Sequence, residues 1–415
     1  MSEYIVEGNK KLIGEVKVSG AKNAALPILA ATILSKKTTT LYNMPEIEDT
    51  KITLEILSIL GCKVSRKSGK IIINTEKIKN TEIPHELMKK LRSSVILVGA
   101  LLGRFNEVIF SCPGGCEIGA RPIDLHLSAF EKLGVKIDKE SGYVKCKTEG
   151  LTGAEILLDF PSVGATENIM MAATLAKGTT IIKNAAMEPE IVDLQNFLNR
   201  MGAKITGAGT NLIKIIGVEK LNDVSYNIMP DRIEAGTLMC MAAITSGKVT
   251  IKNIMPEALT PAIVKLEESG CKIETYKDSL LIEGPKRLKA IEIKTMPHPG
   301  FPTDLQSVFA CMLTVAKGTS IIVENIFENR FKYASELRKM GAKINIEGKM
   351  AVINGVRKLS PASVVATDLR SGAGLVIVAL ATKGVTTITQ IEHILRGYEN
   401  LDKKLQALGA NITQR

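Results

Sequence analysis

Hydrophobic and polar positions repeat along the whole chain. One short phrase recurs with its glycine at positions 61, 134, 202, 270, 341 and 409. It consists of Leu, Met or Ser followed by Gly, a variable residue, Lys or Asn and a β-branched residue. The spacing between these glycines is 68 to 73 residues, so six repeats account for the 415 residues. Regular self-similarity of this kind is typical of a fold assembled from copies of one supersecondary unit.

Each repeat is predicted to have the element order β-β-α-β-α-β. The opening and second strands alternate in polarity and include residues 4–8, 15–18, 280–284, 292–294 and 351–355. The first helices are rich in Ala, Leu and Met and include residues 24–34, 168–176 and 305–316. A Thr/Ile-rich strand and an amphipathic helix follow, for example at residues 179–182, 249–252 and 191–201. β-branched runs favour the pleated conformation.

The two helices of a repeat differ in polarity, which predicts where each lies. The first is apolar nearly all round and should be buried, whereas the second has a polar face and can meet solvent. Strands outnumber helices, which excludes an ordinary singly alternating α/β barrel. We therefore expect buried helices inside and sheets outside, in two closed domains of three repeats each. Lys-Gly or Ser-Gly pairs, as at 177–178 and 246–247, are predicted to close the first helices with a left-handed C-cap.

Composition places the chain among folded globular proteins. Hydrophobic residues make up 45% and charged residues 23%. No apolar run reaches the ~18 residues that a membrane span needs, and no signal peptide is visible, so we expect a cytoplasmic protein. Seven Cys without a Cys-x-x-Cys pair, and four scattered His, support neither a disulfide framework nor a metal site.

The formal net charge of +11 predicts anionic partners. No run of five Lys or Arg occurs, and the chain has no Trp and few other aromatic residues on which bases could stack. Small phosphorylated ligands fit this balance at least as well as nucleic acid. A basic ring that binds duplex DNA stays open as an alternative.

Loops before the first helices carry basic residues where the helix dipole is already positive: Lys22, Arg92, Arg232 and Arg370. A cation is unfavourable there unless an anion joins it. The small loop Ser162-Val163-Gly164 would let backbone N–H groups approach a phosphate. Simple capping by Ser, Thr and Asp is the alternative explanation for these loops.

Loops before the second helices mostly begin with acidic residues, which suit the helix dipole without a further function. The fifth and sixth repeats instead place Arg330 and Arg396 there. The second repeat carries a longer insert, residues 112–124, with three Gly and two Pro around Cys116 and Arg121. A thiol near Arg in a Gly-rich loop suggests a functional cysteine, the alternative being an incidental surface thiol.

These loops resemble those of the UDP-N-acetylglucosamine enolpyruvyl transferases, a group of the enolpyruvyl transferase family. The matching motifs are residues 19–25, 113–126, 163–168, 302–304 and 327–331, and the resemblance covers essentially the whole chain. It implies two inside-out α/β domains of three repeats each, with crossovers near Gly20 and Met229. The first domain would comprise residues 21–229, and the second residues 1–20 and 230–415.

The resemblance also implies a reaction. An enolpyruvyl group would move from phosphoenolpyruvate to the 3-hydroxyl of UDP-N-acetylglucosamine, with release of phosphate, in the first committed step of peptidoglycan synthesis. The chemistry is addition followed by elimination and needs neither a metal nor an organic cofactor. Both substrates are small molecules, so no nucleic acid, membrane or obligate protein partner is implied.

Residue roles follow from the resemblance position by position. Cys116 corresponds to the general acid and Asp304 to the base for the sugar hydroxyl. The phosphoenolpyruvate contacts would be Lys22, Arg121 and Arg396 on the phosphate, Arg330 and Arg370 on the carboxylate, and Asn23 between the two substrates. The UDP-N-acetylglucosamine contacts would be Asn23, Arg92, Arg121, Pro122, Ile123, Asp124, Leu125, Ser162, Val163, Gly164, Asp304 and Ile326.

The nearest alternative is 5-enolpyruvylshikimate-3-phosphate synthase, which shares the fold and the reaction class. The Cys116 loop and the Ser162-Val163-Gly164 loop speak against it. Without the resemblance, Asp304 would be interpreted as a helix N-cap.

Overall fold

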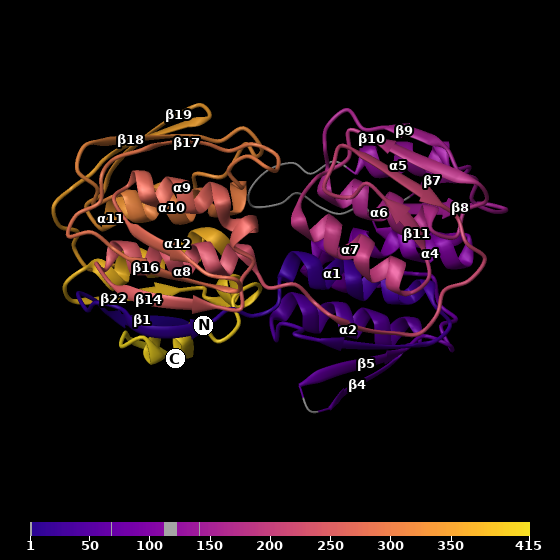
Figure 1. Cartoon of the computed structure of the whole chain (residues 1–415), viewed down its shortest axis with the longest axis horizontal. Coiled ribbons are helices and arrows are strands. Elements are labelled where there is room, and N and C mark those ends of the chain that lie inside the picture. The colour runs from indigo at the N-terminus through magenta and orange to yellow at the C-terminus, as the bar shows by residue number, and fades with distance from the viewer. Residues whose placement is uncertain (1, 68, 112–122, 141) are drawn as a thin grey trace. The chain divides into compact units, whose positions relative to one another are not determined.

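The structure is a computed structural model of the chain. It describes residues 2–67, 69–111, 123–140 and 142–415, with the side chains of Arg92 and Ser93 outside the description. The described residues form a mixed α/β fold of two compact units (Figure 1). Residues 2–19 and 230–415 form one, named the 230–415 unit; residues 20–111 and 123–229 form the other, named the 20–229 unit.

The described part of the 20–229 unit has three sheets, with strand orders β13-β3-β5-β4, β6-β8-β7 and β11-β12-β10-β9. The strands are β3 (Thr38–Tyr42), β4 (Lys63–Lys67), β5 (Lys70–Asn74), β6 (Glu107–Ser111), β7 (Lys136–Glu140), β8 (Tyr143–Lys147), β9 (Glu155–Leu157), β10 (Thr179–Lys183), β11 (Lys204–Thr206), β12 (Leu212–Ile216) and β13 (Val224–Asn227). The helices are α1 (Lys22–Ala31), α2 (Glu48–Leu60), α3 (His85–Lys90), α4 (Leu97–Phe105), α5 (Asp124–Lys132), α6 (Val163–Ala173) and α7 (Pro189–Arg200), with the 3-10 turns η1 (Thr32–Leu34) and η2 (Arg92–Ile96).

Three sheets also form the described part of the 230–415 unit, with strand orders β21-β22-β1-β23, β15-β16-β14-β2 and β17-β18-β20-β19. The strands are β1 (Glu3–Glu7), β2 (Ile13–Lys17), β14 (Lys248–Lys252), β15 (Lys272–Thr275), β16 (Ser279–Glu283), β17 (Glu292–Lys294), β18 (Thr319–Val323), β19 (Lys343–Glu347), β20 (Met350–Asn354), β21 (Ser363–Val365), β22 (Val385–Thr389) and β23 (Asn411–Gln414). The helices are α8 (Arg232–Ile244), α9 (Thr260–Glu268), α10 (Gln306–Leu313), α11 (Tyr333–Lys339), α12 (Leu369–Ala381), α13 (Glu392–Leu395) and α14 (Leu401–Ala407), with the 3-10 turns η3 (Pro256–Leu259) and η4 (Thr303–Leu305).

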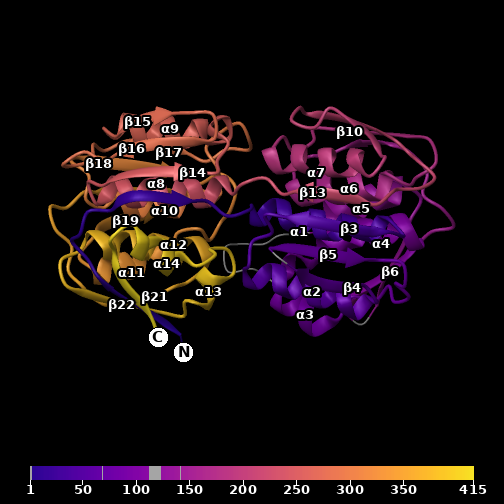
Figure 2. The ribbon, with the colours of Figure 1, turned by 60° about the horizontal axis from the view of Figure 1, so that its bottom comes forward.

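The first strand of the chain belongs with the last ones. β1 lies between β22 and β23 and is antiparallel to both, so that Tyr4 is paired with Ile388 on one side and Gln414 on the other. This pairing brings the two chain ends together (Figure 2). It is the reason why residues 2–19 are part of the 230–415 unit although residues 20–229 follow them in sequence.

The first helix of a repeat lies in the core of its unit, as predicted. In α8 every residue after Arg232 is buried, and in α12 every residue from Arg370 to Leu380 is buried. Helices that lack a continuous polar stripe can bury their whole circumference, which stabilises them only inside a protein. Within the 230–415 unit, α8, α10 and α12 lie between the sheets (Figure 1).

Glycines of the repeated phrase all adopt the left-handed backbone conformation. Their φ angles lie between +87° and +109°, at Gly61, Gly134, Gly202, Gly270, Gly341 and Gly409. An L-residue with a Cβ atom is strained in this region, whereas Gly is not. The phrase therefore recurs because each repeat makes the same turn from its second helix to the strand that follows.

The expected ends of the first helices were partly wrong. α6 ends at Ala173, and Gly178 (φ +88°) lies in the turn that leads into β10 rather than at the helix C-cap. In the pair Ser246-Gly247 the left-handed residue is Ser246, with φ +50°. Gly247 is needed for space instead, because a Cβ atom there would lie 2.4 Å from the carbonyl oxygen of Leu12.

Candidate active site

The described site residues predicted from sequence stand at helix starts or in the loops before helices. In the 20–229 unit, Lys22 and Asn23 open α1. Ile123 is the N-cap of α5, which begins with Asp124 and Leu125, and Ser162 is the N-cap of α6, which begins with Val163 and Gly164. In the 230–415 unit, Asp304 lies in η4, Ile326 and Arg330 precede α11, Arg370 lies in the first turn of α12, and Arg396 follows α13. Cys116, Arg121 and Pro122 lie outside the described residues, as does the side chain of Arg92.

Asp304 is held by two arginines from other elements. Arg330 Nη2 lies 2.7 Å from Asp304 Oδ1, and Arg370 donates to Oδ2 through Nη2 (3.0 Å) and Nε (3.3 Å). The side chains of Arg330 and Arg370 are 3% and 4% exposed, whereas that of Asp304 is 27% exposed. The tertiary structure thus brings together three of the residues predicted from sequence.

The two guanidinium groups determine the charge state of Asp304. Burial alone would raise the pKa of this carboxyl, but Arg370 and Arg330 outweigh it and hold the pKa well below its usual range. Arg330 Nε is buried and makes no hydrogen bond within the described part of the chain. The cluster is therefore an ionised carboxylate paired with two cations.

Lys22 has an anionic partner within its own unit. Its Nζ lies 2.7 Å from Oδ2 of Asp49, a fully buried residue in the first turn of α2. The anion that a cation at this helix start was expected to need is therefore Asp49, a residue of the chain itself. The interpretation of the acidic helix starts as serving only the helix dipole is wrong for Asp49, which also neutralises Lys22.

The start of α6 combines a cap with a close approach. Ser162 is the N-cap and accepts a hydrogen bond from the backbone N–H of Ala165 at 3.3 Å, as the capping explanation predicts. A Cβ atom at Gly164 would lie 3.3 Å from His126 Cε1, so any larger residue would press against α5. Gly164 therefore allows the starts of α5 and α6 to lie side by side.

Asn168, which is buried, and His126, which is half-buried, are polar residues that the sequence did not single out as site residues. Asn168 accepts from the backbone N–H of Gly99 at 2.6 Å and donates to the carbonyl oxygen of Val95 at 3.1 Å. Its Nδ2 lies 3.0 Å from His126 Nδ1. Burial lowers the pKa of His126 to about 4, so the ring is neutral at pH 7.

These contacts tie together the three segments that carry the predicted nucleotide contacts: η2, α5 and α6. The starts of helices in general attract phosphate through their backbone N–H groups. A buried Asn whose partners lie 69 and 73 residues away could be found from sequence only with contact information.

Glu324, directly after β18, is a second residue that sequence reasoning missed. Its side chain has no exposed surface. It accepts hydrogen bonds from the hydroxyl groups of Thr295 and Thr303 and from the backbone N–H of Ile326. The only sequence signal is an acidic residue after the apolar strand Ile321–Val323, where four of the other five repeats carry an amide.

The described cysteines are not reactive groups. Cys62, Cys146, Cys240, Cys271 and Cys311 are buried and unpaired. Burial raises the pKa of all five thiols, for example to about 12 at Cys62 and to about 11 at Cys271. Cys112 and Cys116 lie outside the described residues. Within the described ranges, no group of His, Cys, Asp and Glu could hold a metal ion, and no helix is long and apolar enough to span a membrane.

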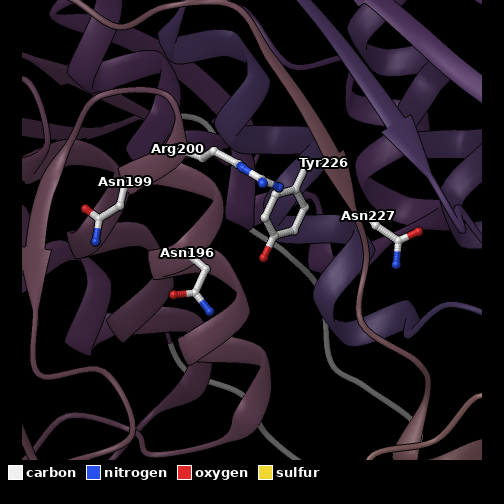
Figure 3. A pocket seen from close by; sticks show the side chains of 5 residues that line it. All are labelled: Asn196, Asn199, Arg200, Tyr226 and Asn227. Atoms are coloured by element: carbon white, nitrogen blue, oxygen red, sulfur yellow. The ribbon is translucent and has the colours of Figure 1, made fainter. Parts of the chain in front are cut away.

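A depression on the 20–229 unit is lined by none of the predicted site residues. It encloses about 450 Å³ and is lined by Asn196, Asn199 and Arg200 of α7 and by Tyr226 and Asn227 of β13 (Figure 3). Asn199 is already engaged, since it bonds both the N–H and the carbonyl group of Ile205. The depression is wide open to solvent and offers one cation, Arg200.

Comparison with known proteins places this architecture in a family. The family model for EPSP synthase (3-phosphoshikimate 1-carboxyvinyltransferase) matches residues 6–405. A relative from Caldanaerobacter subterraneus subsp. tengcongensis, named UDP-N-acetylglucosamine 1-carboxyvinyltransferase 2, is 53% identical over 415 residues and 100% of both chains. UDP-N-acetylglucosamine 1-carboxyvinyltransferase 1 of Carboxydothermus hydrogenoformans is 52% identical over 99% of this chain and 98% of its own.

Solved structures agree on the fold. The enolpyruvyl transferase NikO from Streptomyces tendae superposes with a TM-score of 0.90 at 25% identity, over 100% of this chain and 99% of its own. An EPSP synthase from Acinetobacter baumannii superposes with a TM-score of 0.78 at 19% identity, over 100% of both chains. The second likeness concerns the fold alone.

Proposed function

The chain belongs to the EPSP synthase (3-phosphoshikimate 1-carboxyvinyltransferase) family, and on this premise we propose that it transfers the enolpyruvyl group of phosphoenolpyruvate to the 3-hydroxyl of UDP-N-acetylglucosamine. The observation that carries the proposal is identity of 50% or more, over essentially full length, to several curated relatives named for this activity. The reaction releases inorganic phosphate and is the first committed step of peptidoglycan synthesis.

The reaction needs an acid and a base. A proton adds to the methylene carbon of phosphoenolpyruvate while the sugar oxygen bonds to the adjacent carbon and loses its own proton. A proton then leaves the new methyl group and the phosphate departs, which restores the double bond. Cys116 is the proposed acid: five of the seven cysteines are buried with raised pKa values, which leaves the two thiols of the 112–124 loop as candidates.

Asp304 is the proposed base for the sugar hydroxyl. Its contacts with Arg330 and Arg370 keep it ionised but also make it a weak base. We therefore propose that these guanidinium groups turn to the carboxylate of phosphoenolpyruvate in the working complex. Asp304 would then lose part of its neutralisation and hold a proton more strongly.

The remaining contacts divide between the two substrates. The phosphate of phosphoenolpyruvate would be held by cations, Lys22, Arg121 and Arg396, with Asn23 beside it. The uridine diphosphate would lie on the starts of η2, α5 and α6, near Arg92, Ile123, Asp124, Leu125, Ser162, Val163 and Gly164, continued by Arg121 and Pro122. The amino sugar would meet Asn23, Asp304 and Ile326. Neither a metal nor an organic cofactor is required by this chemistry.

We further propose that each unit is an inside-out α/β barrel that ends at the crossovers near Gly20 and Met229. Wholly buried α8 and α12, and three sheets in the described part of each unit, support this. We expect the enzyme to work in the cytoplasm, where both substrates are made, and to need no protein partner.

Phosphate release tests the proposal. Purified protein is incubated with phosphoenolpyruvate alone, with added UDP-N-acetylglucosamine, and with added shikimate 3-phosphate, the acceptor that the family model's description suggests. We expect turnover only with the nucleotide sugar, and its loss in Cys116→Ala. Turnover with shikimate 3-phosphate instead would replace the proposed acceptor.

A further inference from the structure

Glu324 departs from the internal repeat at a defined place. In four other repeats, the residue after the corresponding strand is an amide in the left-handed conformation, with φ between +54° and +58°, at Asn43, Asn184, Asn253 and Gln390. The three asparagines each donate from Nδ2 to the carbonyl group that follows the neighbouring parallel strand, at 2.7 to 2.9 Å. This hydrogen bond joins the ends of the two neighbouring parallel strands and so closes the sheet edge there.

The fifth repeat makes the same closing bond one residue later. Asn325 Nδ2 donates to the carbonyl oxygen of Thr295, which follows β17, at 3.1 Å. Asn325 therefore has the structural role of the other amides. Glu324 occupies their place in the strand register, yet it is not needed for closing the sheet edge.

The Glu324 carboxylate instead bridges two segments of the 230–415 unit. Its Oε1 accepts from the backbone N–H groups of Ile326 at 2.8 Å and Phe327 at 3.1 Å, and from Thr295 Oγ1 at 3.0 Å. Its Oε2 accepts from Thr303 Oγ1 at 3.0 Å. Ile326 and Phe327 lead to Arg330, whereas Thr303 immediately precedes Asp304 in η4.

A carboxylate with no exposed surface is costly unless its acceptors are satisfied, and here four donors satisfy it. Such a group holds its donors in one geometry, because every alternative leaves a buried charge underbonded. A side chain that does not contact substrate can still position neighbouring residues that do, by holding them through hydrogen bonds.

We propose that Glu324 is a positioning residue that fixes Asp304 and the Ile326 backbone relative to one another. The proposal rests on the proposed function, because it takes these two groups as the ones that meet the amino sugar. One carboxylate thus couples the base to the sugar contact, although Glu324 itself touches neither substrate. Loss of the Thr303 contact should impair the hydroxyl proton transfer more than the binding of phosphoenolpyruvate.

The first test is Glu324→Gln. The amide oxygen can keep the three donors at Oε1, but the Nε2 group forces the Thr303 hydroxyl to turn away from its present role as donor. We expect kcat to fall about tenfold, with KM for phosphoenolpyruvate unchanged, because a small misplacement of a reacting group has a large effect on rate. A lower melting temperature with unchanged kcat would overturn the proposal.

Variants of Thr303 provide a second test, which does not depend on how Glu324→Gln folds. Thr303→Val removes the donor and should reproduce the loss in kcat, whereas Thr303→Ser keeps the hydroxyl and should restore it. The double variant Glu324→Gln/Thr303→Val should be no slower than either single variant, because both break the same contact. Additive losses, or equal rates for Val and Ser, would contradict the coupling.

Asn253→Gly is the matched control. It removes a structural amide at the corresponding position of the same unit, and glycine keeps the left-handed backbone of φ +58°. We expect a lower melting temperature with kcat near that of wild type. If the wild-type protein releases no phosphate with UDP-N-acetylglucosamine, the proposed function is wrong. If the wild-type protein releases phosphate and the Glu324 and Thr303 variants have the same kcat, only the positioning role is wrong.

Discussion

At the scale of single residues, charges in the candidate site are paired within the chain. Asp304 lies between Arg330 and Arg370, and Lys22 lies against Asp49. In both cases a carboxylate neutralises cations that the sequence assigned to substrate. The same contacts therefore contribute to stability, and substitutions there should affect stability as well as turnover.

Asp304→Asn should change how stability depends on pH. The pKa of Asp304 is well below its usual range in the folded protein and about 3.9 in the unfolded chain, so the carboxylate stabilises the fold fully above about pH 5. As pH falls, the unfolded state takes up the proton first and this contribution is lost. The melting temperature of wild type should thus exceed that of the variant most at pH 7, and the gap should narrow towards pH 3.

The measurement is thermal unfolding between pH 3 and pH 7. Asp138→Asn, which changes an exposed aspartate of β7, is the control and should follow wild type throughout. A gap between wild type and Asp304→Asn that stays constant with pH would show that the carboxylate is not stabilised in the folded state.

Lys22→Ala should lower both turnover and stability, and Arg396→Ala should lower turnover without unfolding the protein. Removing Lys22 takes a cation from a carboxylate that has no exposed surface, which can destabilise by up to about 3 kcal/mol. Adding Asp49→Asn should recover stability but not phosphate release. Chemical denaturation and the phosphate assay together check this, and a Lys22→Ala protein as stable as wild type would contradict it.

Cys116 should be the thiol that the phosphonate epoxide fosfomycin alkylates. The five described thiols are buried and have raised pKa values, so they offer little thiolate, and a phosphonate docked in the phosphate subsite would hold the epoxide against Cys116. UDP-N-acetylglucosamine should speed the labelling. Cys116→Asp should keep some turnover and resist the epoxide, and Cys116→Ser should be slower still.

Peptide mass mapping after treatment decides the point. A label on Cys112 or on a buried cysteine, with Cys116 unmodified, would remove Cys116 from its proposed role.

At the scale of the element, glycines have two different functions. Gly341 has φ +87° and open space around a Cβ atom, so its role is conformational. Gly355 has an ordinary φ, but a Cβ atom there would lie 1.8 Å from the carbonyl oxygen of Ala316, so its role is to allow a close approach of the backbone. A glycine in this sequence can therefore have one of two physical causes, a left-handed backbone or a lack of space for a Cβ atom.

Gly341→Ala should destabilise by about 1 kcal/mol through backbone strain alone. Gly341→Asn should cost less, because Asn tolerates the left-handed region better. Gly355→Ala should cost considerably more than either, since backbone atoms would have to move. Urea unfolding of the three variants measures the order, and equal losses at the two positions would contradict it.

At the scale of the whole molecule, the proposed contacts are divided between the two units. Lys22 belongs to the 20–229 unit, whereas Asp304, Arg330 and Arg396 belong to the 230–415 unit. The net charge of +11 suits two anionic substrates. The proposed function therefore assigns residues of both units to the same substrates.

We predict that the units close on UDP-N-acetylglucosamine. Small-angle X-ray scattering should show a smaller radius of gyration with the nucleotide sugar than without it, because binding energy is used to bring the two sets of residues together. Calorimetry on the same sample establishes binding. An unchanged radius of gyration in a sample that binds the sugar nucleotide would exclude closure.

The sequence by itself determined the repeat and its elements, and it predicted most of the residues of the candidate site. Local signals sufficed for the apolar helices, because the polarity of a helix follows from its own residues. They did not suffice for the left-handed caps expected at Lys-Gly and Ser-Gly pairs, which were partly wrong. The loop motifs predicted the family, which comparison with known proteins confirmed.

Only the tertiary structure decided which partner each buried polar group has. Glu324 meets Thr303 across 21 residues, Lys22 meets Asp49 across 27, and Asn168 meets Gly99 across 69. No periodicity marks such a pair, because each partner has its local role as a cap, a strand end or a helix residue. A buried charge or amide is stable only where its donors converge, and convergence is a property of the packed chain.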